Sequence, residues 1–234
     1  MATEPADDDS RGSMENPEKW YGDAQEFWKN VSPTVDGMLG GHAYVSPTDI
    51  YGSNEFINDF LEKNGGFLNN SYALDCGAGI GRVTKHFLLP LFQKVDMVEQ
   101  DKTFVDQAPA FLGEKNYQKI GEIFCSGLQD FTPAAKRYSL IWIQWVLLYL
   151  TDDDLVEFLQ KCQTALLPNG LICLKENVAS KRSVTDREDS SITRTDKRLK
   201  KLFVKAGLNV IKQDVQKGFP KGLFKVKMHE TAFI

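Results

Sequence analysis

The hydrophobic positions of the chain alternate between strand-like and helix-like patterns from about residue 54 onward. Short apolar runs such as "LIWIQW" are typical of strands buried on both faces, and amphipathic segments of helical period separate them. The pattern predicts strands at 71–76, 94–99, 120–125, 138–143 and 170–175, and near 208–215 and 223–231. It predicts helices at 54–63, 80–90, 102–112, 152–166 and 195–206. This alternation favours a doubly wound, seven-stranded, mostly parallel α/β sheet. Because only "KGFPKG" joins the last two strands, we expect them to form an antiparallel hairpin at the sheet edge.

The N-terminal region follows a different pattern. Residues 1–17 are polar and charged, which predicts a disordered acidic tail. The next segment, "WYGDAQEFWKNV", has apolar residues at helical spacing, and "SPTVDGMLGGHAYVSPTDI" after it is interrupted by glycine and proline as loops are. We therefore expect one domain over residues 18–234, in which residues 18–65 form an N-terminal extension with a helix.

Composition and charge narrow the class of protein. With 42% hydrophobic and 26% charged residues, the chain is typical of a globular protein. A net charge of −4 gives no overall attraction to nucleic acid or anionic lipid. No apolar run approaches the ~20 residues of a membrane span, and the acidic start is unlike a signal peptide. The four cysteines form no C-x-x-C motif, so we expect no metal site and a reducing, intracellular compartment.

The stretch "LDCGAGIGR", Leu74 to Arg82, carries three glycines in five positions at the end of the first predicted strand. Ligands of doubly wound sheets bind beyond the C-terminal strand ends, at the switch point of the topology. Gly77 and Gly79 allow the backbone to approach a ligand, and Gly81 allows close packing. Glu99 ends the second predicted strand, where a carboxylate can accept two hydrogen bonds from a ribose diol. The combination favours a nucleoside-type cofactor over the alternative, a tight turn without a ligand.

Three details of this stretch select among nucleoside cofactors. Arg82 stands where the dinucleotide fingerprint needs its last glycine, and the phosphate-loop motif is absent. Asp75, just before the glycines, would repel a buried phosphate and attract a cationic amino-acid group. The planar guanidinium of Arg82 suits a carboxylate, although a surface arginine is the alternative reading.

The pattern acid-x-G-x-G-x-G resembles the S-adenosylmethionine motif of class I methyltransferases, whose cofactor carries an ammonium and a sulfonium but no phosphate. By that resemblance, Gly77 and Arg82 hold the methionine end and Glu99 holds the ribose. The "SGLQDF" loop holds the adenine through Leu128 and Gln129. The cofactor-binding residues that we expect are Asp75, Gly77, Gly79, Arg82, Glu99, Leu128, Gln129 and Gln144.

A narrower resemblance rests on "PTVDGMLGG", "ALDCGAGIGR", "LLPLF", "VDMVE", "GLQDFTP", "IWIQWV" and "LPNG". From about Trp20 to the C-terminus the chain is similar to the α-N-terminal protein methyltransferases. The resemblance implies a Rossmann-like class I domain whose N-terminal extension contributes to the substrate site. It implies transfer of up to three methyl groups to the α-amine of proteins beginning Xaa-Pro-Lys, after removal of the initiator Met, or two when the first residue is proline. We expect protein N-termini as partners, no membrane or nucleic acid, a monomer or weak dimer, and residence in nucleus and cytoplasm.

The same resemblance assigns roles to substrate-site residues. An α-amine with a pKa near ~8 must lose its proton before each transfer, and a neighbouring carboxylate can accept it. This role falls to Asp189, while Asn177 fixes the substrate backbone and Trp145 stacks on the substrate proline. Asp186 and Asp189 would receive the lysine; core packing for Trp145 and solvated loop charges for the aspartates are the alternatives. The substrate-binding residues that we expect are Leu39, Gly40, Val45, Trp145, Asn177, Asp186, Asp189 and Phe224.

Two residues depart from the family pattern. Tyr149 stands where the family commonly has a histidine that is a second candidate base, and Phe224 stands in place of a tyrosine. Tyrosine, with an ordinary pKa near ~10, is a poor base at neutral pH. The predicted catalytic residues are therefore Asp189, acting alone or through Tyr149 and water, with Asn177.

Two rival functions stay open on the sequence. The basic segment "RTDKRLKKLFVK" suggests a nucleic-acid methyltransferase, but it also fits an amphipathic helix that buries its apolar residues. The Asp/Asn-Pro-Pro-Tyr motif of adenine methyltransferases is absent after the fourth strand, where this chain has "QWVLLY". A binding module that retains the cofactor pocket without catalysis is the second rival, against which the intact acid and glycine pattern counts.

Overall fold

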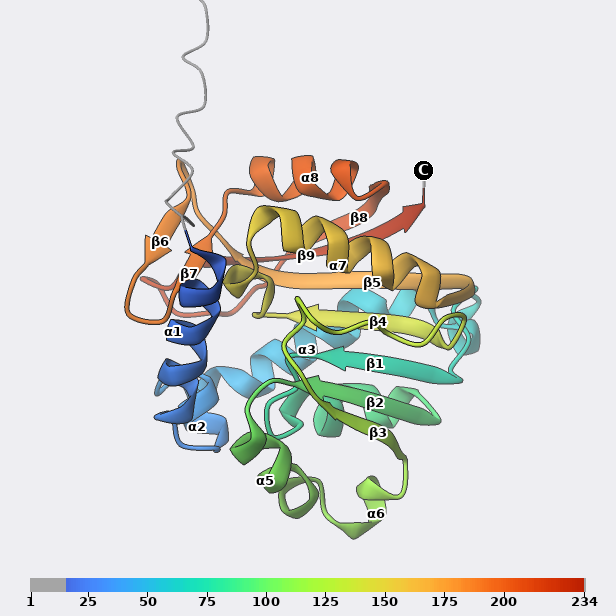
Figure 1. The fold of residues 1–234 in the computed structure, drawn as a ribbon. Coiled ribbons are helices and arrows are strands. Elements are labelled where there is room, and N and C mark those ends of the chain that lie inside the picture. The colour runs from blue at the N-terminus through green and yellow to red at the C-terminus, as the bar shows by residue number, and fades with distance from the viewer. Residues whose placement is uncertain (1–15, 234) are drawn as a thin grey trace, which may run out of the picture.

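A seven-stranded sheet with the strand order β3-β2-β1-β4-β5-β9-β8 forms the centre of the protein (Figure 1). The computed structural model describes residues 16–233. The strands are β1 (Tyr72–Cys76), β2 (Lys94–Glu99), β3 (Ile120–Cys125), β4 (Tyr138–Gln144), β5 (Leu166–Val178), β8 (Leu208–Val215) and β9 (Lys225–Phe233). Strands β1 to β5 pair in parallel, whereas β9 is antiparallel to both β5 and β8. The predicted α/β class and the edge hairpin are confirmed.

The helices cover both faces of the sheet. They are α1 (Pro17–Lys29), α2 (Val35–Met38), α3 (Ser46–Ile57), α4 (Leu89–Leu91) after a π-helical turn at Thr84–Leu88, α5 (Lys102–Leu112), α6 (Glu114–Tyr117), α7 (Asp152–Ala165) and α8 (Asp196–Lys205). Consecutive residues of a strand point to opposite faces, so Leu74 joins a core cluster with α7 and α8, and Ala73 joins one with α3, α4 and α5. No helix within residues 16–233 is long and apolar enough to cross a membrane.

The basic segment "RTDKRLKKLFVK" contains helix α8, whose apolar side packs in the core. Helix α8 buries Leu199, Leu202 and Phe203, each at most 3% exposed, and Ala206 follows them. The apolar stripe therefore has a packing role, as the amphipathic reading predicts. The acidic run at the start of α7 behaves as a helix cap, since the Thr151 hydroxyl accepts from the Asp154 amide at 3.1 Å.

The N-terminal extension contains more helix than the sequence predicts. The predicted tail lies outside the described residues for 1–15, and its last two positions instead cap and begin α1. Helix α3 begins at Ser46, eight residues before the predicted start at 54, so its first residues lie in the segment expected to be a loop. Pro47 is compatible with a first helical turn. The inward face of α3 carries Asp49 and Ser53, so it lacks the apolar period on which the prediction depended.

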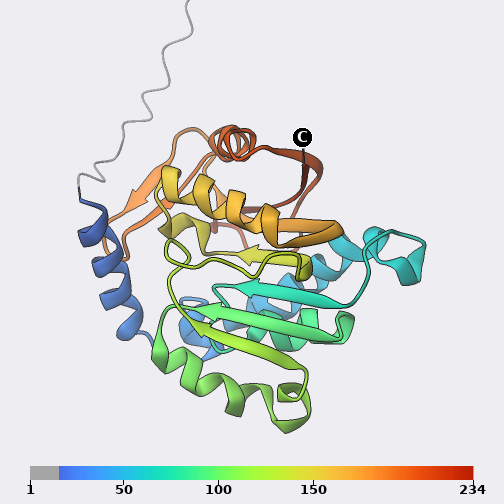
Figure 2. The same ribbon diagram turned by 45° about the vertical axis from the view of Figure 1, so that its right-hand side comes forward.

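The extension is placed at the ligand-binding edge of the sheet. Figure 1 and Figure 2 show α1 standing across the edge toward which the arrowheads of β1 to β4 point. The small hairpin of β6 (Val184–Asp186) and β7 (Ser191–Thr193) lies beside it. The Trp20 indole nitrogen donates to the Tyr149 carbonyl oxygen at 2.7 Å, which ties α1 to the loop after β4.

Candidate active site

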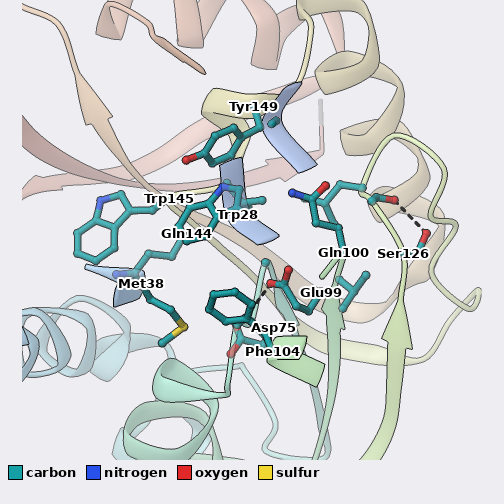
Figure 3. A pocket seen from close by; sticks show the side chains of 18 of the residues that line it. Trp28, Met38, Asp75, Glu99, Gln100, Phe104, Ser126, Gln144, Trp145 and Tyr149 are labelled. Atoms are coloured by element: carbon teal, nitrogen blue, oxygen red, sulfur yellow. Dashed lines mark hydrogen bonds between the residues drawn. The ribbon is translucent and has the colours of Figure 1, made fainter. Parts of the chain in front are cut away.

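A pocket opens at the C-terminal ends of β1, β2 and β4, and the glycine stretch forms its base (Figure 3). Gly77, Gly79 and Gly81 have φ angles of 68°, 56° and 91°, values that other residues rarely adopt. A Cβ atom on Gly77 would lie 2.7 Å from the Val146 Cβ, and one on Gly79 would collide with the Met38 sulfur. At these positions, therefore, only glycine fits both the backbone conformation and the space.

Glu99 is held at one wall of the pocket by backbone groups. Its Oε2 accepts from the Gly79 amide and its Oε1 from the Asp101 amide, both at 2.9 Å. Burial raises the pKa of this carboxyl, while the backbone hydrogen bonds lower it. A carboxylate has about four acceptor positions, so two remain for a ligand diol.

Asp75 and Arg82 both line the pocket and are both buried. The Thr84 hydroxyl donates to Asp75 Oδ2 at 2.5 Å, and burial raises the pKa of Asp75 to about 7. Arg82 is no surface residue, since it is 3% exposed and donates to Asp49 Oδ2 at 2.8 Å. Gln144 donates to the same carboxylate at 2.9 Å.

These residues fit S-adenosylmethionine and disfavour a phosphate-bearing cofactor. Buried Asp75 and half-buried Glu99 are two acids in the pocket lining that would repel a phosphate. An acid such as Asp75 can attract an ammonium, the guanidinium of Arg82 can bind a carboxylate, and Glu99 can accept from a ribose diol. Leu128 is 5% exposed and lines the pocket together with half-buried Gln129, which suits the adenine. All eight residues predicted for the cofactor line this one pocket.

Trp145 lines the pocket directly after β4, on the side of Met38 and opposite Glu99 (Figure 3). Its φ of 53° places a bulky residue in the left-handed region, a conformation that costs about 1–3 kcal/mol and is concentrated at functional sites. The indole is half-buried, and the Phe219 ring centroid lies 6.4 Å from its own. The indole nitrogen is buried without a hydrogen-bond partner among the described residues.

Tyr149 and Asp189 form a hydrogen-bonded pair at the edge of the pocket. The Tyr149 hydroxyl donates to Asp189 Oδ2 at 3.1 Å, and Tyr149 lines the pocket. Burial, together with the Asp189 charge, raises the pKa of Tyr149 well above its ordinary value, so it stays protonated. Burial also raises the pKa of Asp189, against the lowering effect of the hydroxyls of Ser191 and Tyr149. Asp189 Oδ1 is buried and has no hydrogen-bond partner in the described part of the chain.

The remaining predicted substrate residues lie in different environments. Leu39 lines the pocket, and Gly40 follows it with a φ of 57° in an exposed turn. Asn177 is half-buried in β5, and its backbone N–H donates to the Glu176 carboxylate at 2.9 Å. Exposed Asp186 ends β6 and lies near enough to Asp189 to raise the pKa of that carboxyl. Phe224, in the turn before β9, is 44% exposed.

Another predicted substrate residue is a buried one. Val45, expected in the wall over the substrate terminus, is 5% exposed and is absent from the pocket lining. It ends a 3₁₀ turn at Ala43–Val45 and points inward at the start of α3. Burial of this apolar side chain stabilises the turn.

Several pocket residues come from the N-terminal extension and were not predicted. Trp28 of α1 packs edge-to-face on Tyr149 and on Phe104, with centroid separations of 6.0 and 5.9 Å. The Met38 sulfur accepts from the Ile80 amide at 3.4 Å and so covers the glycine loop. The aromatic residues at helical spacing in α1 could have indicated that this helix packs on the pocket, because such residues on a short, exposed helix otherwise lack a packing role.

The strand order, the edge hairpin and the acid–glycine loop at the β1–β4 switch point define a class I S-adenosylmethionine-dependent methyltransferase. A family model described as "AdoMet dependent proline di-methyltransferase" matches residues 16–232, and the chain belongs to that family.

Curated relatives and a solved structure agree with this family. N-terminal Xaa-Pro-Lys N-methyltransferase 1-A of Xenopus laevis is 48% identical over 214 residues, covering 91% of this chain and 95% of the relative. Alpha N-terminal protein methyltransferase 1 of Dictyostelium discoideum is 51% identical over 90% of this chain and 78% of its own. The structure of a SAM-dependent methyltransferase from Leishmania major superposes with a TM-score of 0.85 at 42% identity, covering 94% of this chain and 87% of that one.

Proposed function

We propose that this methyltransferase modifies the α-amino group of proteins beginning Xaa-Pro-Lys after removal of the initiator Met. It adds up to three methyl groups, or two where the first residue is proline. Relatives at 43–51% identity carry that substrate motif or an α-N-terminal activity in their names. The observation that carries the proposal is Asp189: its Oδ1 is buried without a hydrogen-bond partner among the described residues, and its Oδ2 accepts from Tyr149, which lines the pocket. Because the four cysteines are unpaired, we also infer a reducing compartment, nucleus or cytoplasm.

Asp189 is the residue that we propose accepts the amine proton. When bound, S-adenosylmethionine supplies an electrophilic methyl group on its sulfonium. The α-amine must present its lone pair, and Asp189 Oδ1 is the free acceptor for the proton that the nitrogen gives up. Burial raises the pKa of Asp189 toward that of the amine, which improves the match between donor and acceptor.

Tyr149 acts in this scheme as a donor rather than as a base. Its hydroxyl fixes the orientation of the Asp189 carboxylate and stabilises its charged form. Asn177 is proposed to bind the substrate backbone, and the Trp145 face to stack on the proline. Leu39, Gly40 and Phe224 would border the terminus, and Asp186 would meet the lysine.

The proposed proline contact makes a testable prediction for Trp145. The Trp145→Gly variant removes the stacking face and leaves a residue that tolerates the positive φ. We expect kcat/KM for an Xaa-Pro-Lys peptide to fall roughly 10–50-fold, as for loss of a well-packed aromatic contact. The matched Xaa-Ala-Lys peptide should already be poor with the parent enzyme and should lose little more in the variant. Equal losses for both peptides, measured from initial rates, would mean that Trp145 does not read the proline.

A further inference from the structure

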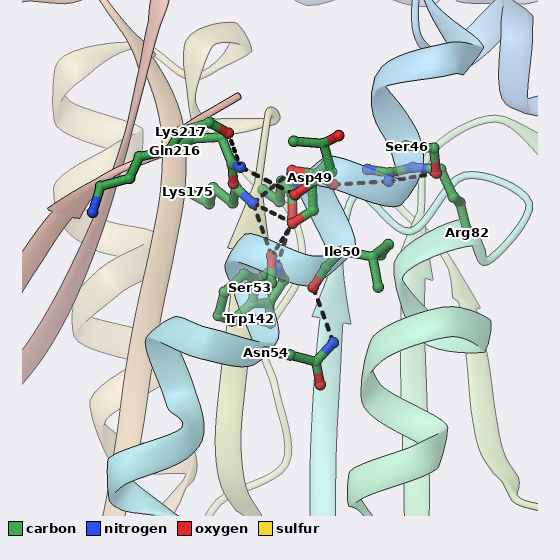
Figure 4. A network of polar contacts seen from close by, with 12 residues as sticks. Ser46, Asp49, Ile50, Ser53, Asn54, Arg82, Trp142, Lys175, Gln216 and Lys217 are labelled. Carbon is green, nitrogen blue, oxygen red and sulfur yellow. Dashed lines mark hydrogen bonds and ion pairs between the residues drawn. The ribbon is translucent and has the colours of Figure 1, made fainter. Parts of the chain in front are cut away.

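A buried network of charged residues lies behind the pocket, centred on Asp49 of α3 (Figure 4). Asp49 Oδ2 accepts from Arg82 at 2.8 Å, and Oδ1 forms an ion pair with Lys175 of β5 at 2.6 Å. None of the three side chains is more than 4% exposed. The network therefore joins the N-terminal extension, the glycine loop and the fifth strand without access to water.

The charges of this network do not cancel. It contains two cations, Arg82 and Lys175, and one carboxylate, Asp49. Burial lowers the pKa of Lys175 to about 8, which leaves it mostly protonated at neutral pH. Burial alone would raise the pKa of Asp49, but Lys175 and Arg82 lower it, so it is ionised. One positive charge is left over, and in a buried site charges interact strongly.

The geometry decides where the surplus charge acts. Lys175 makes three contacts, to Asp49 Oδ1, to the Asp49 carbonyl oxygen at 2.8 Å and to the Ser53 hydroxyl at 2.9 Å. These contacts occupy its three donors, and Lys175 does not line the pocket. Arg82 does line it, and its guanidinium also lies 5.5 Å from the Trp145 ring centroid. The surplus charge is therefore presented to a ligand through Arg82.

An acidic residue near Arg82 also lines the pocket. Asp75, the acid whose pKa the Arg82 charge lowers against the effect of burial, also lines the pocket. An amino-acid zwitterion has one ammonium and one carboxylate, which match one acid and one uncompensated cation. Without Lys175, Asp49 would neutralise the charge of Arg82. Only Asp75 would then remain to bind the zwitterion, through its ammonium.

We propose that Lys175 is a positioning residue for the cofactor, which binds the Asp49 carboxylate so that Arg82 keeps its charge for the carboxylate of the methionine end. The inference rests on the cofactor assignment and is independent of the proposed protein substrate. Its test is therefore a binding measurement without peptide, and methyl transfer to peptide is measured separately.

The experiment compares two ligands by calorimetry. S-adenosylhomocysteine carries the amino-acid carboxylate, whereas 5′-methylthioadenosine lacks the whole amino-acid group. In Lys175→Met, the Kd of S-adenosylhomocysteine should rise at least about tenfold, because the cation that faces its carboxylate is neutralised. The Kd of 5′-methylthioadenosine should stay within about twofold of the parent value, since this ligand has no charge to pair.

A charge-balanced control separates this electrostatic role from a structural one. The double variant Asp49→Asn/Lys175→Met removes both members of the Asp49–Lys175 ion pair, so that Arg82 again carries one uncompensated charge at the pocket. We expect its Kd for S-adenosylhomocysteine to return to within about threefold of the parent. The proposal is overturned if Lys175→Met leaves that Kd unchanged, if both ligands weaken equally, or if the double variant binds as poorly as the single one. Thermal unfolding of each variant confirms that folded protein is compared.

Discussion

Replacing Asp189 by asparagine is expected to lower kcat for an Xaa-Pro-Lys peptide by about 10²–10⁴-fold, the usual contribution of a general base. Asparagine keeps the shape of the side chain and can still accept from Tyr149, but it cannot take up a proton. Since binding contacts are largely kept, the peptide KM should change much less than kcat. Initial rates over a range of peptide concentrations measure both.

Tyr149→Phe is the matched control, because it removes the hydrogen bond to Asp189 and retains the carboxylate. Its loss should correspond to about 1 kcal/mol, roughly a fivefold lower rate. The Tyr149 hydroxyl lowers the pKa of Asp189 against burial. Without it that pKa rises, so the charged base becomes available only at higher pH, and the acid limb of the rate profile moves upward. A nearly inactive Tyr149→Phe beside a nearly normal Asp189→Asn would show that the base is misassigned.

The second large effect is expected from the substrate side. Changing the lysine at peptide position 3 to glutamate should lower kcat/KM roughly 10²-fold, because the glutamate carboxylate then faces the like charges of Asp186 and Asp189. These aspartates lie close enough for one to affect the pKa of the other. Parallel assays of three peptides separate the two electrostatic effects. The lysine-to-glutamine change measures the loss of attraction to the aspartates, and the glutamine-to-glutamate change measures the added repulsion.

Asp186 offers a charge-reversal control that leaves the proposed base, Asp189, unsubstituted. Exposed Asp186→Lys should recover part of the activity on the glutamate peptide and lower it on the lysine peptide. The neutral Asp186→Asn should do neither to the same extent. Because the residue is exposed, added salt should weaken the effect. Similar turnover of the lysine and glutamate peptides by the parent enzyme would contradict a site for lysine at these aspartates.

The regular part of the fold could be predicted because it depends on local patterns. Strands such as β2 and β3, apolar on buried positions and bounded by turns, were predicted at their observed positions, and the edge hairpin followed from a short connection. The start of α3 could not be predicted, because its inward face carries Asp49 and Ser53 in place of apolar residues. Their burial depends on Lys175, which lies 126 positions away in the chain.

The candidate site also contains residues that the sequence pattern identifies and residues that it does not. The glycines and Glu99 could be identified because the topology fixes the ends of β1 and β2 side by side. Trp28 and Met38 reach the pocket only through the path of the extension, which no local pattern reveals. Val45 was assigned to the substrate site by resemblance alone, and the local pattern did not reveal that its side chain is buried.

The most direct test of the proposed function is mass spectrometry of an Xaa-Pro-Lys hexapeptide after incubation with the protein and S-adenosylmethionine. The proposal predicts successive additions of one, two and three methyl groups, or at most two when the first residue is proline. Fragmentation should place all of them on the α-nitrogen, and an Nα-acetylated copy of the peptide should gain none. Methyl groups on the lysine side chain, or equal modification of the acetylated peptide, would contradict it.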